Sequence, residues 1–246
     1  MKKIVTIMFS TAMILSLVAC GNGQLEETTS SSSSSTEVSQ ASSETVDKNK
    51  DENTQTEETD SNRNILIAYF SVPETDGVDT VAGASRVIVD SEVLGNNQYI
   101  AQLIQQEVGG DLFRIETVQE YPGTHEALLE FVYNELSDNA RPELATQIEN
   151  FDSYDVIFLG YPNWNSDLPM PLYTFLEQYD FNGKTIIPFT THGGSGFSRT
   201  VQTIEELQPG ATVVEDALSI SRNHVPEAQN DVASWVRYAL MTEKYE

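Results

Sequence analysis

The chain has almost no cysteine and few basic residues. Its single cysteine, Cys20, excludes an internal disulfide, a cysteine-ligated metal site and a dithiol redox pair. Lysine and arginine together number 13 against 38 acidic residues, which gives a formal net charge of -25. Nucleic acids and anionic lipid headgroups both bind to basic surfaces, so neither is expected as a partner.

Several common catalytic and cofactor-binding patterns are also missing. The three histidines, His125, His192 and His224, lie far apart without paired ligand spacing, so no metal site is predicted. There is no Walker motif and no Gly-x-Gly-x-x-Gly after a strand, which argues against ATP and Rossmann dinucleotide sites. A serine hydrolase needs Gly-x-Ser-x-Gly, but Phe197 occupies the last position after Gly194-Ser195-Gly196.

The N-terminus has the pattern of an export signal. Two lysines precede an apolar stretch from Ile4 to Val18, which is short for a membrane span of roughly 20 residues. The stretch ends in Leu17-Val18-Ala19-Cys20, which resembles the lipobox of bacterial lipoproteins. The resemblance implies that residues 1–20 contain a signal peptide and that Cys20 is lipidated. We therefore expect a lipid anchor on the extracytoplasmic face of a bacterial cell membrane.

Residues 21–62 differ in composition from the rest of the chain. They are rich in serine, threonine and acidic residues, include six consecutive serines at Ser30–Ser35, and lack aromatic side chains. Such a segment buries too little apolar surface to offset its conformational entropy. We predict a disordered tether, which serves either as a spacer from the membrane or as an acidic interaction arm.

Residues 63–246 are long enough for one domain with a sizeable core. Short apolar runs alternate with segments of helical spacing. We expect strands over residues 65–70, 111–117, 155–160, 184–191 and 212–220. We expect helices around residues 99–104 and over 124–136, 169–178, 198–207 and 226–240. A further strand is expected over residues 86–93.

Continuous apolar strands that alternate with helices indicate a parallel sheet covered on both faces. The predicted fold is a three-layer α/β/α sandwich with a five-stranded parallel sheet in the order 2-1-3-4-5. In that order, the loops after strands one, three and four converge at the carboxyl edge of the sheet. Here the loop after strand three is rich in aromatic residues, and the loop after strand four is rich in glycine. We expect a ligand crevice between them.

Three motifs on these loops resemble the flavodoxin-like family. They are Tyr69-Phe70-Ser71, Gly160-Tyr161-Pro162-Asn163-Trp164, and Thr191-His192-Gly193-Gly194-Ser195-Gly196. The resemblance extends over residues 64–240 and implies FMN as the cofactor. It assigns the phosphate to Ser71 and to Asn96 and Asn97, which precede the next helix.

The same resemblance assigns the isoalloxazine ring to the other two loops. Trp164 is expected to stack on the ring, although it could instead dock a partner or turn into the core. His192 is a weak candidate for a catalytic group, and the alternative is an ordinary loop histidine. The remaining residues expected to line the ring are Tyr161, Pro162, Asn163, Asn165, Thr191, Gly193, Gly194 and Ser195.

An insert, residues 72–94, interrupts the phosphate motif, because family members continue directly from the serine into Gly-Asn-Thr and a helix. Part of the insert, Asp79 to Ser85, faintly resembles a sequence to which exported proteins attach FMN covalently. Ala82 and Ser85 depart from that sequence, and a glycine-containing turn is the alternative.

The residues and the resemblance together predict a membrane-tethered FMN redox protein. It would exchange electrons with a partner protein or reduce a small acceptor such as a quinone. One alternative is an NAD(P)H-dependent FMN quinone reductase, although no nicotinamide motif is visible. Another is a surface ligand-binding module of the same fold without redox activity.

Overall fold

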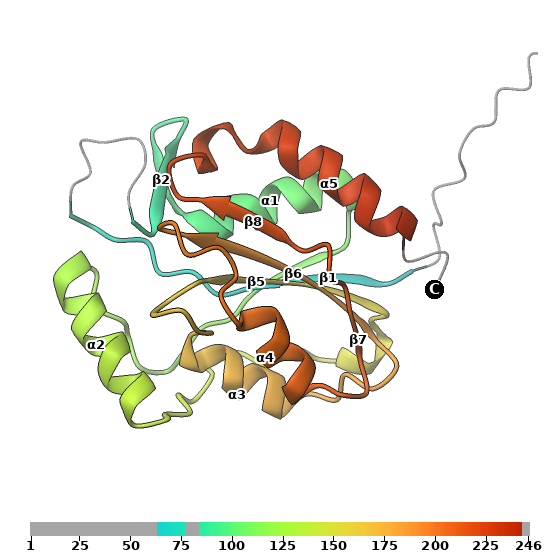
Figure 1. Cartoon of the computed structure of the whole chain (residues 1–246), viewed down its shortest axis with the longest axis horizontal. Coiled ribbons are helices and arrows are strands. Elements are labelled where there is room, and N and C mark those ends of the chain that lie inside the picture. The colour runs from blue at the N-terminus through green and yellow to red at the C-terminus, as the bar shows by residue number, and fades with distance from the viewer. Residues whose placement is uncertain (1–62, 77–83, 243–246) are drawn as a thin grey trace, which may run out of the picture. The chain divides into compact units, whose positions relative to one another are not determined.

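The computed structural model describes residues 63–76 and 84–242, which form an α/β sandwich (Figure 1). The predicted signal peptide, the predicted tether and most of the segment from Asp79 to Ser85 lie outside the described residues. No helix among the described residues has the length and apolar character needed to cross a membrane.

A six-stranded parallel sheet forms the middle layer. Its strands are β1 (Ile65–Tyr69), β4 (Asp111–Arg114), β5 (Val156–Pro162), β6 (Thr185–His192), β7 (Thr212–Val213) and β8 (Leu218–Ser221). The order is β4-β1-β5-β6, with β7 and β8 both paired to β6. Because β7 and β8 share the fifth position, the predicted order 2-1-3-4-5 and the predicted fold class are confirmed.

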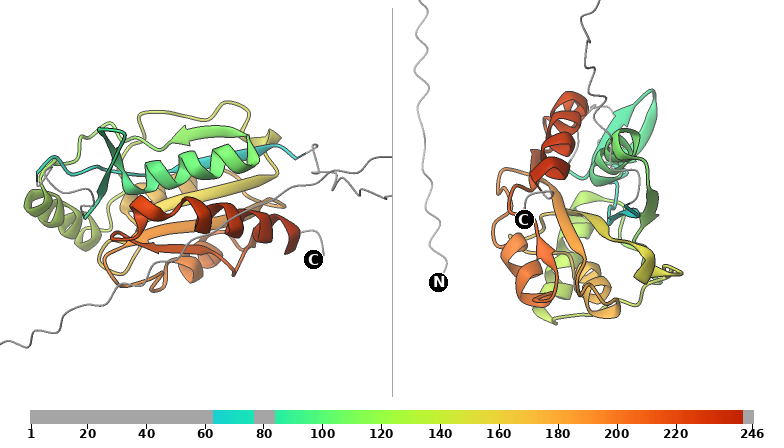
Figure 2. Two further views of the ribbon diagram at one scale, coloured as in Figure 1. Left: turned by 90° about the horizontal axis from the view of Figure 1, so that it is seen from above. Right: turned by 90° about the vertical axis from the view of Figure 1, so that its right-hand side faces the viewer.

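Helices cover both faces of the sheet. Figure 1 shows α1 (Asn96–Val108) and α5 (Gln229–Thr242) on one side, and α3 (Met170–Gln178) and α4 (Thr200–Leu207) on the other. Helix α2 (His125–Ser137) lies beyond the carboxyl ends of the strands (Figures 1 and 2). Short 3-10 turns occupy Phe151–Ser153 and Val225–Glu227.

Two apolar clusters, one on each face, make up the core. Neighbouring strand residues point to opposite faces, so Ile67 and Phe158 belong to the cluster under α1 and α5. Leu66 and Ile157 belong to the cluster under α3 and α4. All seven residues of β5 are buried, as expected for a central parallel strand.

The predicted single strand over residues 212–220 is wrong, because the chain forms β7 and β8 with a break between them. Strand β7 pairs with Thr185 and Ile186, and β8 pairs with β6 from Phe189 onward. The break therefore lies opposite Ile187 and Pro188. Proline has no N–H to donate to a neighbouring strand, which accounts for the interruption.

The predicted single strand over residues 86–93 is also wrong. Strands β2 (Arg86–Val89) and β3 (Glu92–Gly95) form an antiparallel hairpin outside the main sheet. Asp90 and Ser91 connect them with φ values of 50° and 69°. Two consecutive positive φ values are typical of the type I′ turn that closes two-residue hairpins.

Candidate functional site

The first part of the candidate site joins the two halves of the interrupted phosphate motif. Ser71 follows β1, and Gly95 ends β3 and caps the N-terminus of α1. A Cβ atom on Gly95 would lie 2.1 Å from Ser71 Oγ, so the two residues are in direct contact. The insert thus leaves the sheet and returns to the same place, and Ser71 faces the start of α1.

Asn96 and Asn97 lie beside this contact, and each is 1% exposed. Asn97 Nδ2 donates a hydrogen bond of 2.9 Å to Thr191 Oγ1, which connects α1 to the end of β6. The backbone N–H of Asn96 donates to the carbonyl of Ser85 at 3.0 Å. The Oδ1 atoms of both asparagines are buried without a hydrogen-bond partner. Unsatisfied buried polar atoms are uncommon in folded proteins and often mark functional sites.

The aromatic loop after β5 is a tight turn that fixes Trp164. Asn165 and Ser166 have φ values of 51° and 65°, and Trp164 and Asp167 exchange backbone hydrogen bonds of 2.9 and 3.2 Å. The indole contacts Phe70 edge to face at 5.5 Å between ring centroids. Tyr121 lies 5.9 Å from the same indole, so Trp164 is held half-buried at the carboxyl edge of the sheet.

The glycine-rich loop after β6 is tied to the aromatic loop by Asn163. Its Nδ2 donates to the carbonyl of Gly196 at 2.6 Å and to Ser198 Oγ at 3.0 Å. The backbone N–H of Asn163 donates to the carbonyl of Thr191 at 3.0 Å. Asn163 Oδ1 is buried and has no hydrogen-bond partner, so it offers a free acceptor beside the loop.

His192 has a fixed ring orientation. The backbone N–H of Gly194 donates to its Nδ1 at 2.9 Å, so the neutral ring carries its proton on Nε2. Burial lowers the pKa of His192 below its ordinary value of 6.5. The side chain is therefore a neutral hydrogen-bond donor at physiological pH.

A crevice lies between the two loops and the first turns of α2, at the same end of the sheet as the hairpin. It encloses a hollow of about 140 Å³. Trp164 and Gly193 are on its walls, and the apolar side chains of Leu128 and Val132 come from α2. A second, larger hollow of about 300 Å³ has Asp167 and Arg199 among its lining residues. It contains none of the predicted site residues, so the smaller hollow is the candidate site.

The structure places the other predicted residues as follows. Tyr161 and Pro162 are buried in β5. The Tyr161 hydroxyl is hydrogen-bonded to Thr200 Oγ1 of α4 at 2.9 Å, so its ring packs away from the crevice and only its backbone is near the loop. Asn165, Gly193, Gly194 and Ser195 are exposed, and Asn165 and Gly193 line the hollow.

Seven residues that line the hollow were not predicted to be there: Ala84, Ser85, His125, Leu128, Leu129, Val132 and Arg222. Among the described residues, Arg222 forms no ion pair, unlike Arg114, Arg141, Arg199 and Arg237, each of which faces a glutamate. The scarcity of basic residues in the chain is the signal that could have singled it out.

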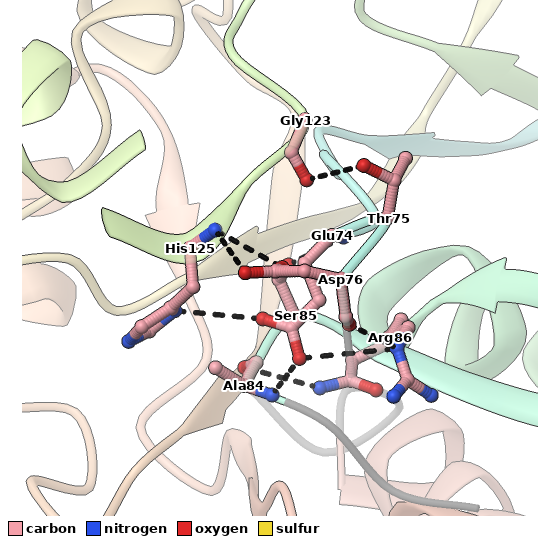
Figure 3. Close-up of polar contacts among 9 residues, drawn as sticks. Glu74, Thr75, Asp76, Ala84, Ser85, Arg86, Gly123 and His125 are labelled. Carbon is pink, nitrogen blue, oxygen red and sulfur yellow. Dashed lines mark hydrogen bonds and ion pairs between the residues drawn. The ribbon is translucent and has the colours of Figure 1, made fainter. Parts of the chain in front are cut away.

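The base of the insert is attached to α2 and to the hairpin by polar contacts (Figure 3). Glu74, 5% exposed, accepts the backbone N–H of Ala84 through Oε1 at 2.6 Å. Its other oxygen, Oε2, lies 3.5 Å from His125 Nδ1. Arg86, 1% exposed, lies 4.0 Å from the same carboxylate. These contacts hold residues 84–86 against the crevice.

Asp76 and Thr75 complete the attachment to α2. The carboxylate of Asp76 accepts the backbone N–H of His125 at 3.1 and 3.2 Å, where an anion is favoured at a helix N-terminus. The backbone N–H and hydroxyl of Thr75 both donate to the carbonyl of Gly123, at 2.6 and 3.0 Å. The first turn of α2 is thus positioned by the insert.

Within residues 63–76 and 84–242, no group of three or more His, Cys, Asp or Glu side chains is arranged to hold a metal ion. The site residues gathered at this edge are hydroxyls, amides, aromatic rings and backbone N–H groups. This chemistry suits an organic ligand with a planar ring and an anionic group.

Known flavoprotein structures and one sequence family are similar to the chain. A structure of a candidate flavoprotein from Bacteroides uniformis matches with a TM-score of 0.56 and 24% identity, over 71% of this chain and 98% of that one. A flavoprotein from Lactobacillus acidophilus in complex with FMN matches with a TM-score of 0.49 and 18% identity, over 70% of this chain and 98% of that one. No curated protein sequence matches significantly. The sequence model of the flavodoxin family matches residues 64–239, and the chain therefore belongs to the flavodoxin family.

Proposed function

We propose that the chain binds FMN in the crevice and uses it to pass electrons to a small acceptor or a redox partner. Membership of the flavodoxin family supports FMN as the cofactor. The observation that carries the proposal is the contact between Ser71 and Gly95. It brings the two halves of the interrupted motif together, which supports a phosphate site there.

The start of α1 fits the phosphate of FMN. The N-terminus of a helix attracts anions through its dipole. Ser71 adds a hydroxyl donor at the same point, and it is 4% exposed. Thr191 can donate as well as accept a hydrogen bond, so the amide of Asn97 can turn its Nδ2 toward an anion without losing that partner.

The crevice fits the ring of FMN. Trp164 supplies an apolar face and Gly193 supplies backbone without a side chain. The free Oδ1 of Asn163 would accept the ring imide N–H, and His192 would donate from Nε2. Donors near the ring stabilise the negative charge that reduction adds. FMN, when bound, would supply one- and two-electron transfer.

The small enclosed volume has a functional consequence. A hollow of about 140 Å³ is less than the roughly 300 Å³ of common ligand pockets. A ring in this crevice would be only partly enclosed and would keep one edge toward solvent. An exposed edge is what electron transfer to an external acceptor requires.

The proposal includes a membrane anchor at Cys20, which rests on the N-terminal sequence. A lipid at this cysteine and the acidic segment that follows would hold the redox domain outside the cell membrane. The Cys20→Ser variant should move from the membrane fraction to the soluble fraction. Retention of this variant in the membrane would refute a lipid anchor at this residue.

The test of FMN binding uses the full chain in detergent and the fluorescence of FMN. Binding should quench the flavin, and Trp164→Ala should weaken both binding and quenching. Trp235→Phe is the matched control. Trp235 belongs to α5 and packs against Phe158 of the sheet, away from the crevice. No quenching at micromolar FMN would refute the proposal. Oxidation of NAD(P)H by the FMN-loaded chain with a quinone would establish the reductase alternative.

A further inference from the structure

We propose that His125 is the proton donor for a quinone-type acceptor reduced in the crevice, and that Glu74 is the residue that positions it. The inference rests on the proposed function. His125 lines the hollow together with Trp164, and its side chain is 46% exposed. It can therefore reach both an acceptor in the crevice and the solvent.

The orientation of the His125 ring is set by Glu74. Nδ1 lies 3.5 Å from Glu74 Oε2, an ion-pair distance, and this buried oxygen has no hydrogen-bond partner. Figure 3 shows Nδ1 turned toward Glu74 and the other ring nitrogen turned away from the carboxylate. A carboxylate beside one nitrogen of an imidazole orients the ring, which leaves Nε2 free to deliver a proton to an acceptor.

Glu74 is itself held in place. Its Oε1 accepts the N–H of Ala84, and Ser85 Oγ accepts the N–H of Glu74 at 3.0 Å. The backbone of His125 is fixed separately by the carboxylate of Asp76. The carboxylate and the imidazole are therefore positioned by different contacts. A substitution of either side chain leaves the attachment through Asp76 intact.

The reduction balances with one proton from His125. Conversion of a quinone to a hydroquinone adds two electrons and two protons. FMN, when bound and reduced, would supply both electrons and one proton as a hydride equivalent. The second proton comes from the imidazolium: its Nε2–H bond breaks and a hydroquinone O–H bond forms. The neutral ring then regains a proton from solvent.

The experiment compares two oxidants of the full chain loaded with FMN and reduced with dithionite. Stopped-flow absorbance follows flavin reoxidation by 1,4-benzoquinone, which needs protons, and by ferricyanide, which accepts an electron without a proton. His125→Asn should slow the benzoquinone reaction by about 10²-fold, in the range of general acid catalysis, and leave the ferricyanide rate within about twofold. Added imidazole should restore part of the lost benzoquinone rate.

Two further variants separate positioning from general damage. Glu74→Gln should slow the benzoquinone reaction selectively, by a smaller factor than His125→Asn. His224→Asn is the matched control, because His224 is exposed and does not line the crevice, and neither rate should change. Equal loss of both rates in His125→Asn, or no loss with benzoquinone, would overturn the inference. Failure of the unsubstituted chain to bind FMN would instead refute the proposed function on which it rests.

Discussion

Replacement of Gly95 by alanine tests the reconstruction of the phosphate motif most directly. Gly95 has φ -70° and ψ 145°, a backbone conformation that alanine adopts without strain. The added Cβ would lie 2.1 Å from Ser71 Oγ and 2.9 Å from Ser71 Cβ. Ordinary contact begins at 3.4 Å, so Ser71 or the start of α1 must move by about 1.3 Å. The variant therefore perturbs the proposed phosphate site, at Ser71 and the start of α1, through one contact.

The magnitude follows from what Ser71 and α1 would contribute. A hydrogen bond to a charged group is worth roughly 1.5–3 kcal/mol, so its loss should weaken FMN binding by about 10- to 150-fold. Overpacking should also lower the free energy of unfolding by roughly 1–3 kcal/mol. Fluorescence titration with FMN gives the first quantity, and urea denaturation gives the second.

Two controls separate the phosphate from the rest of the ligand. Riboflavin lacks the phosphate, so its affinity should be nearly the same in Ser71→Ala and in the unsubstituted chain, whereas FMN affinity should fall. The double variant Ser71→Gly with Gly95→Ala removes the clash. It should recover stability but not FMN affinity. FMN affinity that is unchanged in folded Gly95→Ala would refute the assignment of the phosphate to this contact.

Three further predictions concern the core and the titratable groups. Gly160→Ala would place a Cβ 2.1 Å from the buried ring of Phe189, so urea denaturation should show a loss of roughly 1–3 kcal/mol, and adding Phe189→Leu should recover part of it. Because burial lowers the pKa of His192, the folded state resists its protonation. The free energy of unfolding should therefore fall as the pH drops below about 6.5, and His192→Gln should reduce this slope. Burial raises the pKa of Glu135, and the hydrogen bond of 2.7 Å from Tyr121 opposes the shift only in part. The contribution of Glu135 to stability should thus be lost as the pH rises above about 4.5, and a Glu135→Gln variant that keeps the same slope in urea denaturation would contradict this.

The main sheet was predictable because its strands are buried on both faces. Such strands appear in sequence as continuous apolar runs, and β5 and β6 are the clearest cases. The division of the fifth strand into β7 and β8 was not predictable from residues 212–220 alone, because the cause is Pro188, which lies in β6. Pro188 affects the pairing of residues about 25 positions away only because β6 is the neighbour.

The aromatic loop after β5 and the glycine-rich loop after β6 could be located from the sequence because each follows its strand directly. The direction of individual side chains could not. Tyr161 lies in the same motif as Trp164, but alternation along β5 turns its ring into the core under α4. The unsatisfied Oδ1 of Asn163 is likewise invisible in a sequence, because it depends on which donors the folded loops bring near.

The insert explains why the lining residues Ser85, His125 and Leu128 were not predicted from the sequence. In sequence it separates Ser71 from Gly95 and weakens the phosphate motif. In the fold, the hairpin returns Gly95 to Ser71, and Glu74, Thr75 and Asp76 attach the first turn of α2 to the same edge. The insert therefore brings Ser71 and Gly95 together and adds polar contacts beside them. Those contacts include a buried carboxylate and a half-exposed histidine facing a crevice in which the predicted reaction needs a proton. The segment that made the assignment of FMN harder from the sequence is thus the one that positions the proposed acid, His125, at the start of α2.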